Sequence, residues 1–121
     1  MTTGRVTRRL TLDEDVIRAY SRRGNYHSDA STAAAVGLPG LLAQGVHVAG
    51  PAYGTLLDAW GAVFLERGEL DLRFLSPVYA GETVEATVTI DDTDDTATLE
   101  VTNVDDGRVT VAGTATRASR D

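Results

Sequence analysis

The sequence predicts an α+β domain in which one antiparallel sheet wraps around one long central helix. Three observations support this: a strand-like alternation near the N-terminus leads into short helical segments, a long apolar stretch runs from Gly45 to about Leu65, and the rest of the chain alternates with a period of two. A chain of 121 residues has room for one hydrophobic core. We therefore expect residues 1–121 to form a single domain.

The first part of the chain predicts one strand and two short helices. Residues 5–11 alternate as a strand does, and the acidic residues 13–15 suit the first turn of a helix that reaches about Tyr20. A polar stretch with little regular pattern follows. Asp29 is a good N-cap, and Gly37 a good stop, for the alanine-rich helix expected between them.

The apolar stretch from Gly45 to about Leu65 predicts the central helix. Its large side chains fall on one helical face, at i, i+3, i+4, i+7 and i+11: Tyr53, Leu56, Leu57, Trp60 and Phe64. Smaller apolar residues cover its other sides: Val46, Val48, Ala49, Ala52, Ala59 and Val63. We therefore expect a helix that is buried nearly all round. Pro51 must bend this helix or mark its first turn, because its ring excludes a hydrogen bond to the carbonyl four residues earlier.

After Gly68 the period changes from 3.6 to two, which predicts four strands. Apolar and polar residues alternate over four segments: 70–74, 84–90, 97–101 and 109–113. Asp105-Asp106-Gly107 predicts a tight hairpin turn, and the acidic run at 91–95 predicts a looser one. An antiparallel sheet around one helix is the hotdog fold. A cone-shaped α+β barrel is the alternative, but it needs two or three amphipathic helices at the front.

Composition narrows the classes of function. The formal charge of −7 argues against a nucleic-acid partner, because phosphates are repelled over most of the surface. The chain has no cysteine, which excludes disulfides, thiolate metal sites and cysteine nucleophiles. No apolar run approaches the roughly 18 residues that span a bilayer, and residues 1–10 lack the apolar core of a signal peptide, so we expect a cytoplasmic protein without a membrane partner.

No metal or cofactor is expected. The two histidines and the scattered acids fit no metal-ligand spacing, and no glycine motif for phosphate binding is present. A sheet with one helix on it leaves strand edges and apolar surface to cover, so we expect a homodimer.

One segment carries a specific resemblance. The residues that carry it, spaced without a gap, are His27, Asp29, Ala33, Gly37, Pro39, Gly40, Leu42, Ala43 and Gly45. They resemble the active-site segment of the MaoC-like hydratase/dehydratase family. Residues 72–78, followed by residues 81–84, look like that family's r-F-x-x-P-V-x-x-G-d-x-v strand. The resemblance covers roughly residues 12–116.

The resemblance implies a hotdog fold and a lyase. In that family an Asp and a His five residues apart flank a water, which they add to or expel from a 2-enoyl or 3-hydroxyacyl thioester of coenzyme A or acyl carrier protein. Backbone N–H groups at the start of the long helix hold the thioester oxygen. In this chain Arg22 stands where the family has its Asp. A guanidinium cannot take the proton of water, so the usual two-group hydration is in doubt.

The candidate site follows from these matches. Its expected catalytic residues are His27, Arg22 and Asn25, and its expected substrate-binding residues are Tyr26, Gln44, Gly45 and His47. His27 would act as acid and base on a thioester or a polyketide-like intermediate, in dehydration, hydration, isomerisation or cyclisation. Arg22 would hold an enolate or carboxylate oxygen.

Two other functions stay open. The chain could be a non-catalytic hotdog protein that binds an acyl ligand, or the degenerate partner of an active subunit; Arg22 pointing to solvent would favour this class. A hotdog thioesterase is the third hypothesis. It needs a carboxylate on the long helix, where Asp58 and Glu66 lie too far along.

Overall fold

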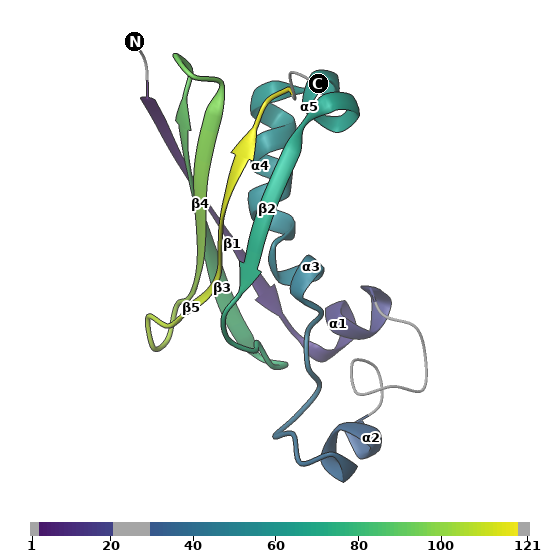
Figure 1. Cartoon of the computed structure of the whole chain (residues 1–121). Helices are drawn as coiled ribbons and strands as arrows, with labels where there is room; N and C mark the ends of the chain where they lie inside the picture. The colour runs from purple at the N-terminus through teal and green to yellow at the C-terminus, as the bar shows by residue number, and fades with distance from the viewer. Residues whose placement is uncertain (1–2, 21–29, 119–121) are drawn as a thin grey trace.

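The computed structural model describes residues 3–20 and 30–118 of the chain, and in this part it is one five-stranded antiparallel sheet with five helices (Figure 1). The strands are β1 (Thr3–Leu12), β2 (Glu69–Phe74), β3 (Glu82–Asp91), β4 (Thr96–Asn103) and β5 (Val109–Thr116). The helices are α1 (Glu14–Tyr20), α2 (Ala30–Ala35), α3 (Gly45–Val48), α4 (Gly50–Trp60) and α5 (Ala62–Arg67). The strand order β1-β3-β4-β5-β2 places β1 and β2 at the two edges.

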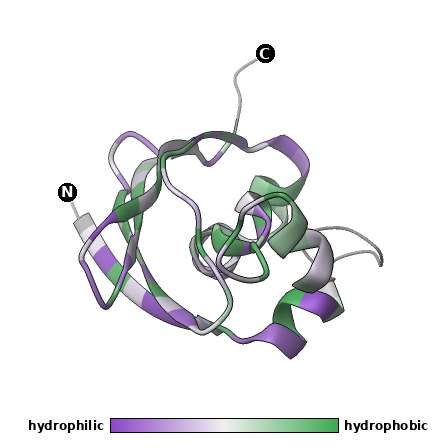
Figure 2. Ribbon diagram, turned by 90° about the horizontal axis from the view of Figure 1, so that it is seen from below, coloured by the Kyte–Doolittle hydropathy of each residue, from purple (hydrophilic) through white to green (hydrophobic). Residues whose placement is uncertain are grey.

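The sheet curves around α4, as the view along this helix shows (Figure 2). Helix α4 contacts β1, β3 and β4. Burial alternates along β3, where Val84, Ala86, Val88 and Ile90 face the core. This alternation follows from the period of two, since successive side chains of a strand point to opposite faces. The predicted α+β fold and all five predicted strands are confirmed.

The single long helix that the sequence predicted is broken into three pieces. Helix α3 ends at Val48, and Pro51 lies in the first turn of α4, where its missing N–H costs no helical hydrogen bond. The N–H of Gly61 donates to the carbonyl of Leu57 and ends α4. Gly61 has φ 66° and ψ −149°, a conformation that a side chain disfavours, and α5 leaves in a new direction.

The expectation that the central helix is buried nearly all round is also wrong for the single chain. Leu56 and Phe64 are buried, and Trp60 packs partly buried against the ring of Phe64, with 5.4 Å between the ring centroids. The other side of the helices faces outward, because one sheet can cover only one side of a helix. Val46 is 63% exposed, Leu65 is 64% exposed and Ala59 is exposed.

Strand β5 departs from strict alternation. Thr110 and Val111 are both buried, whereas the sequence predicted Thr110 on the outer face. The pairing of β4 with β5 shifts register between Val101 and Thr102, which turns Thr110 inward. Its hydroxyl donates to the carbonyl of Val101 at 2.9 Å, so the buried oxygen is satisfied.

The predicted turns and caps between the elements are present where the structure describes them. Asp13, which the sequence placed in the first turn of a helix, instead precedes α1, and its Oδ1 accepts the N–H of Val16 at 2.8 Å as an N-cap does. Gly107 has φ 73° in the hairpin between β4 and β5, a value that suits the glycine of this turn. Asp29, the predicted cap of α2, lies outside the described residues. In Figure 1, α3 continues downward from α4, and α1 and α2 lie below it at the lower right of the molecule.

Candidate functional site

Gly45 is the first residue of α3, as the motif predicted. Gln44 before it is extended, with φ −70° and ψ 142°, and its carbonyl accepts the N–H of Val48 at 3.0 Å. The carbonyl of Gly45 accepts the N–H of Ala49 at 3.0 Å. The chain therefore changes from extended to helical at Gly45. The first N–H groups of a helix have no acceptor within that helix.

Two connecting segments meet beside Gly45. Leu42 and Tyr79 form an isolated antiparallel bridge. The N–H of Ala43 donates to the carbonyl of Val78 at 2.8 Å, and the N–H of Ala80 donates to the carbonyl of Leu41 at 2.9 Å. These bonds hold the segment that enters α3 against the connection from β2 to β3.

An apolar pocket of about 320 Å³ lies between these segments and β5. Its lining residues are Leu42, Ala43, Gly45, Val48, Phe74, Leu75, Ser76, Pro77, Val78, Thr110 and Val111. The hydroxyls of Ser76 and Thr110 donate to the carbonyls of Val109 and Val101. Most of the wall is thus hydrocarbon, and its two hydroxyl groups are held by backbone carbonyls. A pocket of this size and character suits an apolar ligand group.

A polar network holds one wall of the pocket in place. Nη2 of Arg108 donates to the carbonyl of Pro77 at 3.0 Å. Arg108 also lies 3.7 Å from Oε2 of Glu82, and that oxygen accepts the Nδ2 group of Asn103 at 2.5 Å. Asn103 is fully buried. The network ties the β4–β5 hairpin to the connection from β2 to β3, which fixes Pro77 at the pocket wall.

The structure describes three of the seven residues predicted for the site. Gly45 lines the pocket, and Gln44 and His47 lie beside it in the chain without lining it. Burial lowers the pKa of His47 below its ordinary value of 6.5. Neutral imidazole is therefore the favoured form of His47 near neutral pH. Arg22, Asn25, Tyr26 and His27 lie outside the described residues.

Sequence reasoning missed most of the pocket wall. The alternation predicts that Phe74 belongs to a strand and that Thr110 faces outward, and it gives neither residue a place in a pocket. Residues 72–78 did carry a signal, since they resemble the family's strand motif, but that motif gives no position in space. No sequence signal indicated that Thr110 faces the pocket, because the register shift that turns Thr110 inward is a property of strand pairing.

Elsewhere in the described part of the chain there is no metal site and no thioesterase carboxylate at the pocket. Asp58, weighed as a thioesterase carboxylate, is exposed, forms an ion pair with Arg8 and does not line the pocket. Among residues 3–20 and 30–118, no group of three or more His, Asp or Glu side chains is placed to hold a metal ion. Within the same residues, no helix is long and apolar enough to cross a membrane.

The fold and the pocket define a hotdog domain with an apolar pocket, and comparison with known sequences identifies the family. The sequence pattern described as the MaoC-like domain matches residues 2–112. The chain therefore belongs to the MaoC-like dehydratase family. No curated protein is significantly similar to the chain in sequence.

Solved structures share the fold at low sequence identity. The unliganded R-hydratase PhaJ1 from Pseudomonas aeruginosa is similar with a TM-score of 0.77 and 17% identity, over 95% of this chain and 79% of that one. The (R)-hydratase from A. caviae involved in PHA biosynthesis has a TM-score of 0.69 and 20% identity, over 94% and 91%. The ChsH1–ChsH2 complex from Mycobacterium tuberculosis has a TM-score of 0.73 and 18% identity, over 96% and 97%.

Proposed function

We propose that the chain is a hydro-lyase-like enzyme that acts on a 3-hydroxyacyl or 2-enoyl thioester, or on a polyketide-like intermediate. The proposal rests on the apolar pocket whose wall includes Gly45. Leu42, Ala43 and Gly45 of the pocket wall belong to the same sequence motif as His27, which supports a role for His27 at this pocket. The apolar wall suits an acyl chain, and a thioester carbonyl at Gly45 would lie near the first N–H groups of α3.

His27 is the proposed acid and base. In the dehydration direction it would take the proton from C2 and return it to the hydroxyl leaving C3, which departs as water and leaves a C2=C3 double bond. Arg22 cannot act as a base, because a guanidinium stays protonated. It would instead hold the developing enolate or a substrate carboxylate through two parallel hydrogen bonds, with Asn25 beside it. Tyr26, Gln44 and His47 would help to place the substrate.

The test is turnover of a panel of enoyl and 3-hydroxyacyl thioesters, from crotonyl-CoA to longer and branched acyl groups, followed by the absorbance of the enoyl thioester. We expect poor hydration of crotonyl-CoA and better turnover of larger substrates. With the best substrate, His27→Gln should cut turnover by about 10²–10⁴, the usual worth of a positioned acid or base. A loss below roughly threefold in a folded variant would exclude His27 from this role.

Two variants, Arg22→Ala and Arg22→Lys, test whether activity needs the positive charge and the planar guanidinium of Arg22. Arg22→Ala should abolish or strongly weaken activity, and Arg22→Lys should restore only part of it, since the planar fork is lost. Arg18→Ala is the matched control, because Arg18 is an exposed arginine of α1 that pairs with Glu14. Efficient crotonyl-CoA hydration by the wild type, or full activity in Arg22→Ala, would contradict the proposed role of Arg22.

A non-catalytic acyl-binding protein is the alternative function. The same pocket supports it, because an apolar pocket binds an acyl chain whether or not a reaction follows. The two functions separate in one experiment: binding of the panel thioesters measured by calorimetry, without turnover of any of them, would favour the binding protein.

The assembly that we propose is a homodimer. Strands β1 and β2 are open edges of the sheet in the described chain, and Val46, Leu65 and Phe74 leave apolar surface exposed. Light scattering should give about twice the mass of one chain, which is 12.8 kDa.

A further inference from the structure

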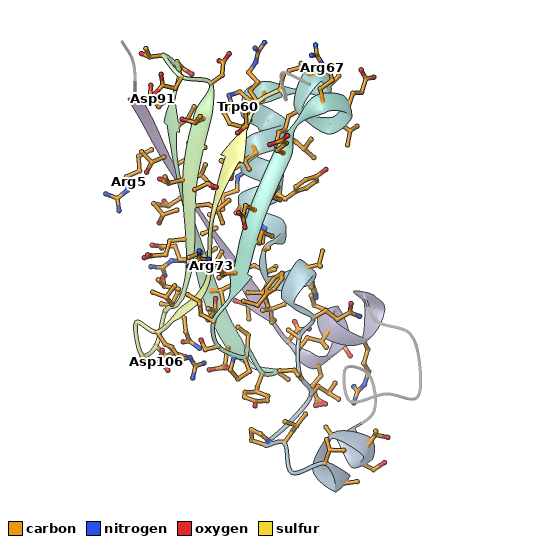
Figure 3. The ribbon with its side chains drawn as sticks, viewed as in Figure 1. Arg5, Trp60, Arg67, Arg73, Asp91 and Asp106 are labelled. Atoms are coloured by element: carbon orange, nitrogen blue, oxygen red, sulfur yellow. The ribbon has the colours of Figure 1, made fainter. Side chains whose placement is uncertain are left out.

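Two hydroxyl groups interrupt the apolar wall of the pocket. Of the described residues that line the pocket, Ser76 and Thr110 alone carry a polar side chain. Ser76 lies in the connection from β2 to β3, and Thr110 lies in β5. Figure 3 labels two landmarks of this region, Arg73 near the end of β2 and Asp106 in the β4–β5 hairpin. The hydrogen-bonding state of these hydroxyls decides which polar group of a ligand the pocket can satisfy.

The protons of both hydroxyls are already used. Oγ of Ser76 donates to the carbonyl of Val109 at 2.9 Å. Oγ1 of Thr110 donates to the carbonyl of Val101, also at 2.9 Å. A hydroxyl has one proton to donate but two lone pairs that can accept. Toward a ligand, both groups are therefore acceptors, and the ligand has to supply the donor.

The backbone beside Ser76 offers no donor in their place. The N–H groups of Leu75 and Ser76 both point to the carbonyl of Thr110, at 2.8 and 3.4 Å. Pro77, the next residue, has no N–H. Along residues 75–77, a ligand carbonyl or carboxylate thus finds no free backbone N–H, whereas a ligand hydroxyl finds an acceptor in Oγ of Ser76.

The two hydroxyls differ in how far a ligand can reach them. Ser76 is half-buried, so its oxygen lies within reach of a group that enters the pocket. Thr110 is fully buried, so its hydroxyl belongs to the packed wall behind the pocket surface. Ser76 is therefore the residue that can select a ligand, and Thr110 provides a matched comparison.

We propose that Ser76 is a specificity-determining residue, and that the pocket takes an acyl group with a hydroxyl of its own, separate from the C3 hydroxyl that takes part in the reaction. The ligand hydroxyl donates to Oγ of Ser76, and the rest of the acyl group packs against the hydrocarbon wall. The inference rests on the proposed function and narrows its substrates to hydroxylated, polyketide-like acyl groups. A plain alkyl chain excludes water from Oγ of Ser76 and gives it no donor in return, which weakens binding.

The experiment is isothermal titration calorimetry of the wild-type protein with octanoyl-CoA and with its 6-, 7- and 8-hydroxy derivatives. These saturated thioesters have neither a C2=C3 double bond nor a C3 hydroxyl, so they undergo neither hydration nor dehydration. We expect at least one hydroxy ligand to bind about two- to tenfold more tightly than octanoyl-CoA, the effect of one ordinary hydrogen bond. In Ser76→Ala this preference should vanish or reverse, because the acceptor is gone.

The control is Thr110→Val, which removes the hydroxyl behind the wall and keeps the branched shape of the side chain. It should retain the wild-type preference even where it lowers stability. Equal affinity of the wild type for all four ligands, or no measurable binding, would overturn the inference. So would a preference that Ser76→Ala retains or that Thr110→Val loses. If Ser76→Ala weakens all four ligands equally, the donor is an amide N–H of the pantetheine arm that they share, and the proposed acyl class is wrong.

The same measurements separate this inference from the proposed reaction. A preference that depends on Ser76, without turnover of any enoyl or 3-hydroxyacyl thioester, would support the ligand class and contradict the enzyme. Turnover of enoyl thioesters by a protein that binds octanoyl-CoA and its hydroxy derivatives equally would support the enzyme and overturn the role of Ser76.

Discussion

The ring of Phe74 lies directly against the backbone of Gly45. A Cβ atom at position 45 would stand 2.6 Å from Cδ1 and 2.7 Å from Cε1 of Phe74. Gly45 begins α3 and Phe74 ends β2, so this contact joins the start of the helical layer to the sheet edge at the mouth of the pocket. Glycine suits position 45 because the ring of Phe74 leaves no room for a Cβ atom. The backbone conformation of Gly45 does not itself call for glycine.

Gly45→Ala should therefore displace the ring of Phe74. We expect it to destabilise the wild-type fold, because overpacking outweighs the gain from replacing a helical glycine. In a Phe74→Ala background the same substitution should stabilise by about 0.4–1 kcal/mol, since the obstruction is gone. Chemical denaturation of the four proteins of this double-mutant cycle measures the coupling. Additive effects would mean that the ring moves aside at no cost.

Gly113→Ala should loosen β2 from β5. A Cβ atom at position 113 would overlap the carbonyl oxygen of Asp71, which is backbone and cannot swing away. We expect a loss of about 1–3 kcal/mol in the free energy of unfolding. Gly4→Ala in β1 is the control, because a Cβ there meets nothing within 4 Å. Equal thermal unfolding of the two variants would contradict the prediction.

Asn103→Asp should destabilise the protein in a pH-dependent way. The substitution replaces a donor to Glu82 with a second carboxylate at hydrogen-bonding distance, in a fully buried position. Asn103→Ala loses the same bond and the Oδ1 acceptor for the N–H of Asp105, at a cost of about 1–3 kcal/mol. Only the Asp variant should regain stability as the pH falls, since one proton can then be shared between two carboxyls. Denaturation curves at neutral and acidic pH give the free energy of unfolding of the two Asn103 variants. If it changes with pH by the same amount in both variants, the prediction is contradicted.

His47 should titrate below 6.5. Burial lowers its pKa, so the folded chain binds this proton less readily than the unfolded chain does. The resulting stability is present above pH 6.5 and is lost as the pH falls toward the lower, folded pKa. The chain has two histidines, so NMR titration of His27→Gln leaves one imidazole to follow. A pKa at or above 6.5 would contradict the prediction.

The sequence determined the elements of the fold through local patterns. The period of two predicted all five strands, and Asp105-Asp106-Gly107 predicted the hairpin between β4 and β5, because side-chain alternation and turn chemistry are properties of neighbouring residues. The apolar run predicted helix, and Pro51 lies in a first turn, which was one of its two expected places. The motif that ends at Gly45 predicted the start of a helix and the MaoC-like family, both of which are confirmed.

Tertiary structure alone decided which residues share a pocket and which faces stay exposed. Gly45, Phe74 and Thr110 are far apart in the sequence, and they meet because β2 and β5 pair in one register and α3 packs against their ends. The shift between Val101 and Thr102 turned Thr110 inward, against its alternation. Among the described residues, the sheet covers one side of the central helical region, since one sheet has one concave face. Hydrophobicity in a sequence predicts that a surface will be covered, whereas only the packing of the folded chain shows which part its own sheet covers.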